Sequence, residues 1–334
     1  MTSFRPAAYR PHRRRAAAAL AFAPLAAAMP AARAQAALPR SVSLLVPQTT
    51  GGSNDVFARA LATRLAKVLD TAVIVENRPG AGGNLGSAWV ARSAPRDGSV
   101  WLVTVNSVQS MGPVLYRNAG FDPVGDFEPV GAIALVPHVL LANPAVPAAG
   151  LAEVVELARR DPQKYSYGSS GNGTFSHLLM ELMKKTRGIA MTHVPYKGVA
   201  PALTDLVGGQ IQYVISTVPA AMGFVRGGQL KPLAVTSLAR AAALPEVPLA
   251  NDVVPGMVGE LWVGVYGPRG VPREALEAMR AGVARVQAMP DWEAFCASQG
   301  AAAMRVGAAE LATLTRQEID KWGPLVREIG LQID

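Results

Sequence analysis

Short apolar runs alternate with longer segments of helical periodicity from about residue 41 onward. The first run, at 42–46, has the length and composition of a buried strand. A helix is predicted over 55–69, where apolar residues recur on one face, and another over 85–93. Strands are predicted between them at 72–76 and after them at 100–105. This alternation predicts a parallel sheet with crossover helices.

A second α/β unit is predicted after the long apolar run at 129–141. It has strands at 165–167, 190–194, 210–216 and 230–236, and helices at 151–160, 175–185, 200–207 and near 220–226. The chain then continues through a strand at 261–266 into helices at 273–287, 291–299 and 308–329, which we expect to pack on the first unit. The predicted domains are therefore 37–130 with 237–334, and 131–236.

Residues 1–36 have a different pattern. Five arginines and no acid precede an apolar, alanine-rich segment over 16–29, and Ala34-Gln-Ala36 is a small-x-small cleavage site. This predicts a secretory signal peptide, cleaved after about Ala36, and a periplasmic protein. The apolar segment is too short to span a bilayer. The arginines at 13–15 leave the general and the twin-arginine export routes open, and a disordered basic tail is the alternative.

Charge and cysteine content narrow the function classes once the signal is set aside. Six of the 32 Lys and Arg, and none of the 24 acids, lie in residues 1–36, which leaves 26 against 24 in the remainder. Most of the formal charge of +8 therefore comes from the export signal. Because the remainder of the chain is nearly neutral, we expect no nucleic-acid partner. Cys296 is the one cysteine, so no internal disulfide is expected, and its place in an amphipathic helix indicates a buried apolar role.

The turn after the first strand is the first candidate site. A Gly-rich turn that leads into a helix leaves backbone N–H groups unpaired, adds positive dipole charge and lets a ligand approach closely. We predict that it binds the carboxylate of a small ligand through Thr49, Gly51, Gly52, Ser53, Asn54 and Asp55. Because Asp55 is itself an acid, we expect it to brace the loop. The alternative is an ordinary turn capped by Ser53 or Asn54.

A second Gly/Ser turn precedes the helix at 175–185 and forms the other half of the candidate site. Strand ends of two α/β units that face each other form a cleft, where small ligands bind. The residues predicted to contact ligand here are Ser169, Ser170, Gly171, Asn172, Gly173 and Thr174, with Lys197, Gly198 and the strand-end residue Asn106. Ser176 can cap the helix or bind ligand, and a solvent-facing lysine is the alternative for Lys197.

Other chemistries fit the sequence less well. The turn at 80–86 has the spacing G-x-G-x-x-x-G, so we expect no dinucleotide cofactor, and no cofactor of another kind is indicated. The histidines lack metal-binding spacing. An exported serine hydrolase using Ser170 and His177 is the alternative function, although no G-x-S-x-G elbow is present. We interpret His177 as a core histidine that holds the turn.

Several of these segments together resemble one family, the substrate-binding proteins of tripartite tricarboxylate transporters, also called Bug-type extracytoplasmic solute receptors. The resemblance rests on residues 46–59 (VPQTTGGSNDVFAR), 75–86 (VENRPGAGGNLG), 96–98, 168–178, 193–209 (beginning HVPYKG), 233–237 and 244–248, and covers nearly all of the chain after the signal. Within the first turn, the family usually has Pro-Gly-Gly where this chain has Thr50-Gly51-Gly52.

The resemblance implies a two-domain periplasmic-binding-protein fold of the flytrap type (type II), with a parallel-rich sheet in each domain. It implies a small carboxylate ligand held by backbone amides and ordered water from 49–55 and 169–174, with Lys197 and Gly198 beside them. We therefore expect a monomeric receptor without catalytic activity, whose partners are the ligand and either transporter membrane subunits or a sensor protein.

Overall fold

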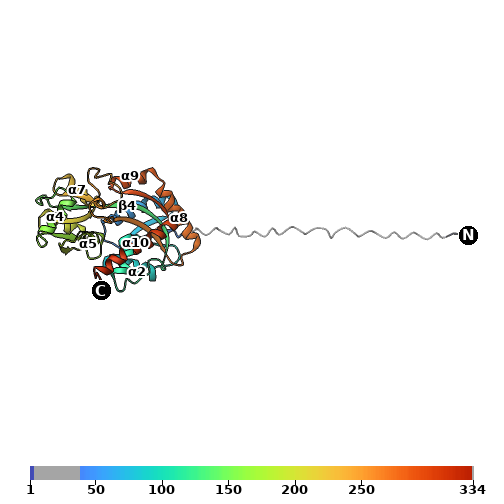
Figure 1. The fold of residues 1–334 in the computed structure, drawn as a ribbon. Coiled ribbons are helices and arrows are strands. Elements are labelled where there is room, and N and C mark those ends of the chain that lie inside the picture. Colours follow the sequence, from blue (N-terminus) through green and yellow to red (C-terminus); the bar gives the residue numbers. More distant parts are fainter. Residues whose placement is uncertain (4–37, 333–334) are drawn as a thin grey trace. The chain divides into compact units, whose positions relative to one another are not determined.

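Strand β4, Phe127–Ala142, runs through the middle of a ten-stranded sheet (Figure 1). The strand order is β2-β1-β3-β9-β4-β7-β5-β6, and β8 and β10 also pair with β4. The first part of β4 pairs with β9 (Glu260–Pro268) and β10 (Ala302–Gly307). Its last residues pair with β7 (Tyr213–Thr217) and β8 (Lys231–Val235). Strand β4 therefore belongs to both parts of the sheet: one part contains β1, β2, β3, β9 and β10, and the other contains β5, β6, β7 and β8.

The structure is a computed structural model that describes residues 1–3 and 38–332. The predicted signal peptide and its cleavage site lie outside the described residues, apart from the first three. Among the described residues, no helix combines the length and the apolar character that crossing a membrane requires.

Two groups of parallel strands confirm the predicted alternation. β1 (Ser41–Val46) lies between β2 (Ala72–Asn77) and β3 (Val100–Val105), joined by helices α1 (Ser53–Leu69) and α2 (Asn84–Arg92). β5 (Ser166–Ser169) likewise lies between β6 (Thr192–Pro195) and β7, with α5 (Phe175–Arg187) and α6 (Val199–Val207) as the connections. The sheet is mixed rather than wholly parallel, because β4 runs antiparallel to each of its four partners.

The remaining elements surround this sheet. They are η1 (Ala81–Gly83), the π-helical turn η2 (Ser107–Met111), α3 (Gly112–Leu115), α4 (Leu151–Arg160), α7 (Val218–Arg226), η3 (Ala250–Asp252), α8 (Arg273–Gln287), α9 (Pro290–Ser298) and α10 (Ala308–Glu328). Strand β10 was not predicted, because its residues are mostly half-exposed or exposed and lack a clear alternation.

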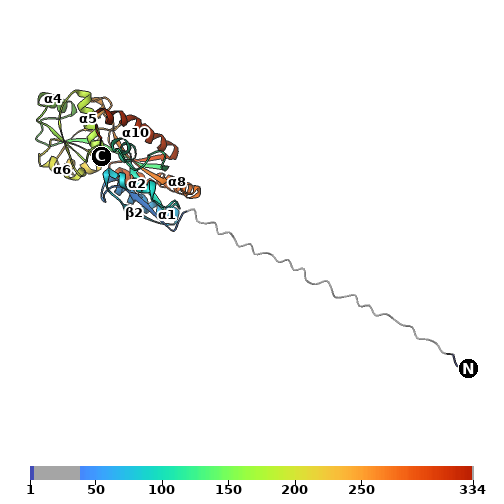
Figure 2. The ribbon, with the colours of Figure 1, turned by 90° about the horizontal axis from the view of Figure 1, so that it is seen from below.

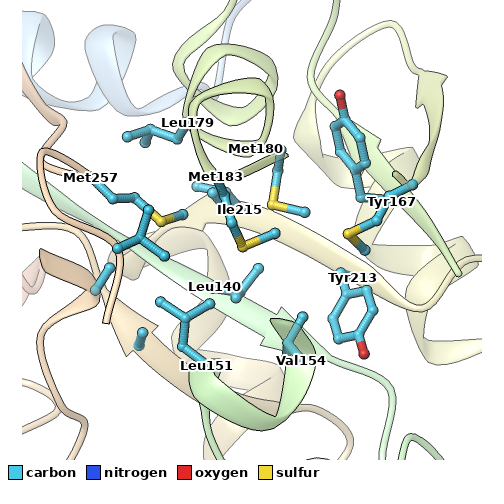
Figure 3. Close-up of a cluster of buried hydrophobic side chains, with 14 of the residues drawn as sticks. Leu140, Leu151, Val154, Tyr167, Leu179, Met180, Met183, Tyr213, Ile215 and Met257 are labelled. Carbon is cyan, nitrogen blue, oxygen red and sulfur yellow. The ribbon is translucent and has the colours of Figure 1, made fainter. Parts of the chain in front are cut away.

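Buried apolar clusters lie on both faces of the sheet. Around β1, β3 and β9, Phe57 of α1 packs edge-on against Trp292 of α9, with ring centroids 6.4 Å apart. Cys296 is fully buried in the same cluster, which confirms its apolar role. Figure 3 shows the cluster around β4, β5 and β7, in which Met180 and Met183 of α5 lie near Leu140, Ile215 and Tyr213.

The last helix, α10, lies beside α5 (Figure 2). Its side chains join apolar clusters in both parts of the sheet. Leu311 at its start packs in the cluster with Trp262 and Tyr266 of β9, whereas Trp322 contacts Phe175 of α5 at 5.4 Å between ring centroids. The predicted domain limits 37–130, 131–236 and 237–334 remain a prediction. β4 passes the first limit without a break, and α10 reaches beyond the unit to which it was assigned.

Candidate functional site

A cavity of about 450 Å³ lies where the carboxyl ends of the strands meet the helix starts of both parts of the sheet. Its lining residues are Pro47, Gln48, Thr49, Gly52, Ser53, Asn54, Pro79, Gly80, Gly82, Gly83, Val105, Ser107, Val108, His138, Ser170, Thr174, Phe175, Ser176, Lys197, Gly198, Val199, Ile215, Ser216, Thr217 and Leu261. The volume is within the range of small-molecule sites.

Five helices begin at this cavity. The residues that precede their first turns all line it: Gly52 for α1, Gly83 for α2, Thr174 for α5, Gly198 for α6 and Thr217 for α7. None of these five residues caps its helix with a side-chain hydrogen bond. The first N–H groups of an α-helix have no partner within it, and each helix adds positive partial charge at this end. In α2, however, the N–H groups of Asn84 and Leu85 bond to the preceding turn η1, so α2 offers mainly its dipole. The cavity is therefore suited to an anion.

Among the described residues, the one charged side chain in the cavity lining is positive. Lys197 is the one Lys or Arg in the lining, and no Asp or Glu of the described residues lines it. Lys197 is exposed, and no ion pair joins it to an acid in the part of the chain that the structure describes. It remains available to complement a bound carboxylate.

Asp55 braces the first glycine turn, as its negative charge in an anion-binding loop suggested. Its buried carboxylate accepts hydrogen bonds from the Gly51 N–H, Arg59 Nε and Asn77 Nδ2, each at 2.9 Å. Burial alone raises the pKa of Asp55, but these hydrogen bonds outweigh it and hold the pKa below its ordinary value. Asp55 does not line the cavity.

Two of the segments that carry the family resemblance, 46–59 and 75–86, are joined by the hydrogen bonds around Asp55. Asn77, at the end of β2, donates to Asp55 and to the Gln48 carbonyl at 3.1 Å, and its own oxygen accepts from Arg59. Asn54 Nδ2 donates to Gln48 Oε1 and to the carbonyl of Val103. The alternative of Ser53 or Asn54 as the helix cap is wrong, because α1 begins at Ser53 and Gly52 is its N-cap residue.

The second turn is held by a cluster of hydroxyl groups. Ser176 Oγ accepts from the Ser170 N–H at 2.9 Å and lies 3.0 Å from Ser170 Oγ and 2.8 Å from Thr174 Oγ1. Thr174 Oγ1 also donates to the Gly171 carbonyl at 2.7 Å. Since these three hydroxyl-bearing residues line the cavity, the residues whose side chains shape the turn also face the cavity.

His177 holds the second turn from behind, which confirms its interpretation as a core histidine. Its Nδ1 accepts a hydrogen bond from the Gly173 N–H at 3.1 Å. Its ring stacks on that of His193, with centroids 3.9 Å apart, and His193 Nε2 lies 2.7 Å from Ser169 Oγ. Burial, and to a smaller extent the neighbouring His177, lowers the pKa of His193 to about 4. Burial also lowers the pKa of His177, so both rings are neutral near pH 7.

The structure does not form the pair required by the hydrolase alternative. Ser170 Oγ contacts Ser176, and His177 Nδ1 is occupied by the backbone of Gly173. The Ser–His contact that does form uses Ser169, which is fully buried and does not line the cavity. No acid among the described residues is hydrogen-bonded to His193, so no oriented triad is present.

The structure divides the predicted site residues into two groups. Those that line the cavity are Thr49, Gly52, Ser53, Asn54, Ser170, Thr174, Lys197 and Gly198. Those that do not are Gly51, Asp55, Asn106, Ser169, Gly171, Asn172 and Gly173. Asn106 is fully buried, and its amide donates to the Glu260 carbonyl and accepts from the Ser107 and Trp262 N–H groups, so its side chain fixes β3 to β9.

Sequence reasoning missed one wall of the cavity. His138 of β4, Phe175, Ile215 and Leu261 form it together with the β7 residues Ser216 and Thr217. A signal for His138 was visible, because Pro137-His138 is the only interruption of a long apolar run. Ser53 Oγ and Thr217 Oγ1 lie 3.5 Å apart, which brings the start of α1 against the start of α7 beside this wall.

No group of three metal-ligating side chains is found in residues 1–3 and 38–332. The turn at 80–86 contributes Gly80, Gly82 and Gly83 to the cavity lining. Gly83 has a φ of +109°, and a Cβ there would lie 2.7 Å from Val108 Cγ2. This glycine is therefore required for the backbone to pass close to the cavity.

This α/β fold, with a solute-sized cavity at its strand ends and helix starts, is shared with the solved structure of the periplasmic binding protein BugD, which has a TM-score of 0.79 at 30% identity and covers 88% of this chain and 98% of its own. The chain therefore has the fold of the periplasmic binding proteins. Within that class, a family model described as "Tripartite tricarboxylate transporter family receptor" matches residues 57–331. The chain belongs to this family, which confirms the resemblance found in its sequence motifs.

Individual relatives agree with this assignment over nearly their full lengths. Protein BugT of Bordetella pertussis is 31% identical over 296 residues, which cover 88% of this chain and 90% of BugT. The solved structure of R. palustris Rpa4515 with adipate has a TM-score of 0.81 at 32% identity, covering 87% of this chain and 97% of its own. MatC from Rhodopseudomonas palustris, solved with bound malate, has a TM-score of 0.78 at 29% identity, covering 86% and 99%.

Proposed function

We propose that the protein captures a small carboxylate in the 450 Å³ cavity and releases it unchanged. The observation that carries the proposal is the convergence of five helix starts on a cavity lined by Lys197 and by no acid of the described residues. A favourably placed helix terminus stabilises an anion by about 0.3–1 kcal/mol. The adipate and malate in two similar structures support the same ligand class.

The ligand is held between the two loops in this proposal. Gly52 to Asn54 of the first loop and Ser170, Thr174 and Ser176 of the second contact its carboxylate, and Lys197 adds charge from β6–α6. The two parts of the sheet close on it as a hinge through β4, and Ser53 and Thr217 form part of the closing contact.

A thermal-shift screen tests the ligand class. The probes are succinate, malate, glutarate, adipate, citrate and benzoate, each beside a neutral amide or alcohol of similar shape, with a neutral sugar as a further control. At 100 times Kd, binding adds about 2.7 kcal/mol to the free energy of unfolding. For about 300 residues this is a rise of roughly 4 °C in Tm. A shift with the sugar and none with any carboxylate contradicts the proposal.

Two glycines provide a matched pair of variants that test the site. Gly52 and Gly150 are both N-cap residues in extended backbone, and an added Cβ would meet no atom within 3.4 Å at either. Only Gly52 lines the cavity. Gly52→Ala should weaken carboxylate binding about tenfold or more by calorimetry, equivalent to about 1.4 kcal/mol, whereas Gly150→Ala should leave affinity unchanged. Equal affinities in both variants would place the ligand elsewhere.

We further propose that the chain is exported, loses residues 1–36 and acts in the periplasm as a monomer. It then presents the ligand to the membrane subunits of a transporter; delivery to a sensor protein is the alternative. Fractionation of cells that express the full chain tests the location. A periplasmic species whose mass matches residues 37–334 is expected, and a cytoplasmic species that retains the N-terminal segment contradicts the proposal.

A further inference from the structure

His138 lies at the apolar wall of the cavity with one ring nitrogen fixed by the fold. It is 5% exposed, pairs with Thr217 across β4 and β7, and packs against Phe175 with ring centroids 5.6 Å apart. Its Nδ1 is 3.3 Å from the Gly259 carbonyl oxygen. A carbonyl only accepts, so the hydrogen of the neutral ring must be on Nδ1.

The other ring nitrogen, Nε2, is consequently an acceptor. Burial lowers the pKa of His138 to about 4, although the hydrogen bond to Gly259 opposes this shift, so the ring stays neutral near pH 7. Within the described residues Nε2 has no hydrogen-bond partner, yet it is not among the polar atoms sealed from solvent. Because His138 lines the cavity and its Nδ1 edge is occupied, Nε2 is the edge that a ligand can reach.

An acceptor in an otherwise anion-binding cavity restricts what can lie beside it. A second carboxylate there would bring lone pairs against the lone pair of Nε2. An ammonium group would donate, but it would enter a cavity with five helix starts, Lys197 and no lining acid to balance its charge. A hydroxyl group donates without charge and satisfies both conditions.

We propose that His138 is a specificity-determining residue that accepts a hydrogen bond from a hydroxyl group of the ligand, so that the receptor selects hydroxycarboxylates. The inference rests on the proposed carboxylate-binding function and names the ligand class within it. The carboxylate lies at the helix starts, the hydroxyl group at Nε2, and the carbon skeleton against Phe175, Ile215 and Leu261.

Matched ligand sets test the proposal by calorimetry at pH 7.5. Each set contains an unsubstituted acid, its hydroxy derivative and its amino derivative: succinate, malate and aspartate; glutarate, 2-hydroxyglutarate and glutamate; benzoate, 4-hydroxybenzoate and 4-(aminomethyl)benzoate. In at least one set the hydroxy acid should bind about 2- to 12-fold tighter than the unsubstituted acid, the ratio that one neutral hydrogen bond provides. The amino acid should bind more weakly than the hydroxy acid.

His138→Phe keeps an aromatic ring at the wall but removes the acceptor, and Thr236 Oγ1 still donates to the Gly259 carbonyl at 2.7 Å. In this variant the hydroxy preference should fall to about one, whereas the control Phe175→Leu should change the affinity for all members of a set alike. Preference retained in His138→Phe overturns the proposal, as does a preference for the amino derivative in the wild type.

Nitrogen NMR of the histidine-labelled wild-type protein gives a second readout that needs no variant. The expected result is an Nδ1–H tautomer whose Nε2 resonance moves on addition of the preferred hydroxy acid and stays in place with its unsubstituted partner. An Nε2–H tautomer, or equal movement with both ligands, overturns the proposal. Absence of binding by every carboxylate would instead overturn the proposed function itself, so the two failures are distinguishable.

Discussion

Replacing Asp55 by alanine removes the carboxylate on which the first glycine turn is hydrogen-bonded. The Gly51 N–H and Asn77 Nδ2 lose their acceptor inside the protein, and Arg59 loses its ion pair at 2.9 Å. Arg59 is about half exposed, with a side-chain accessibility of 48%, so water takes over its solvation and this loss adds little. Gly51 is exposed and Asn77 is half-buried, so the loss consists of their two hydrogen bonds to the buried carboxylate. At about 1–1.5 kcal/mol for each, we expect a cost of about 2–3 kcal/mol in the free energy of unfolding.

Ligand affinity should change far less than stability. Asp55 does not line the cavity, and the loop keeps the hydrogen bonds from Asn54 and Asn77 to Gln48. Urea denaturation should therefore show the loss of stability, equivalent to roughly 3–5 °C in Tm, while calorimetry with the preferred carboxylate gives an affinity within about threefold of wild type. Much tighter binding by Asp55→Ala would show that the carboxylate repels the ligand directly and would refute the bracing role.

The pH dependence separates charge from shape. The folded-state pKa of Asp55 lies below its ordinary value of 3.8, so folding favours the ionised form. This contribution is fully present above the unfolded pKa and is lost as pH falls through the lower folded pKa. Asp55→Asn keeps the shape without the charge, and its stability deficit should therefore be constant near neutral pH and narrow below about pH 4. A deficit that grows on acidification would contradict the sign of the shift.

Three further outcomes follow from other contacts of the site. Gly173→Ala should lower the free energy of unfolding by about 2–4 kcal/mol in a denaturant titration, because φ is +75° and the new Cβ would overlap Leu115. The control Gly223→Ala, at a helix position with open space around it, should leave the free energy of unfolding unchanged or raise it. Lys197→Met should weaken carboxylate binding about two- to fivefold at low salt and less at high salt, by calorimetry. Stability measured as Tm should decline between pH 6.5 and about 4 as His193 is forced to protonate, and this decline should be smaller in His193→Phe.

The two loops of the site were predictable because their signals are local. A strand, a glycine turn and a helix start within fifteen residues specify backbone N–H groups at the carboxyl edge of the sheet, whatever lies opposite. Thr49, Gly52, Ser170 and Thr174 line the cavity for this reason, and their contact with ligand stays a prediction. The bracing role of Asp55 was predictable from its charge alone.

The residues that were missed or misplaced depend on long-range pairing. His138 reaches the cavity because β4 pairs with β7, which places it beside Thr217, 79 positions further along the chain. Asn106 was expected to face the ligand at the end of β3. It turns to the backbone of Glu260 and Trp262 instead, because β9 pairs antiparallel with β3 and brings those groups alongside. Neither strand pairing can be predicted from the local sequence around His138 or Asn106.

This division between local and long-range residues bears on how the ligand is selected. The segments that carry the family resemblance supply helix starts and the residues that brace them, including Asp55, Arg59 and Asn77. We expect these helix starts to bind the carboxylate group that all such ligands share. Thr50, which differs from the usual family residue in the first turn, does not line the cavity. We therefore expect the features that distinguish one carboxylate from another on β4 and β7, outside those segments. Exchange of His138 should alter ligand choice, while exchange of Thr50 should not.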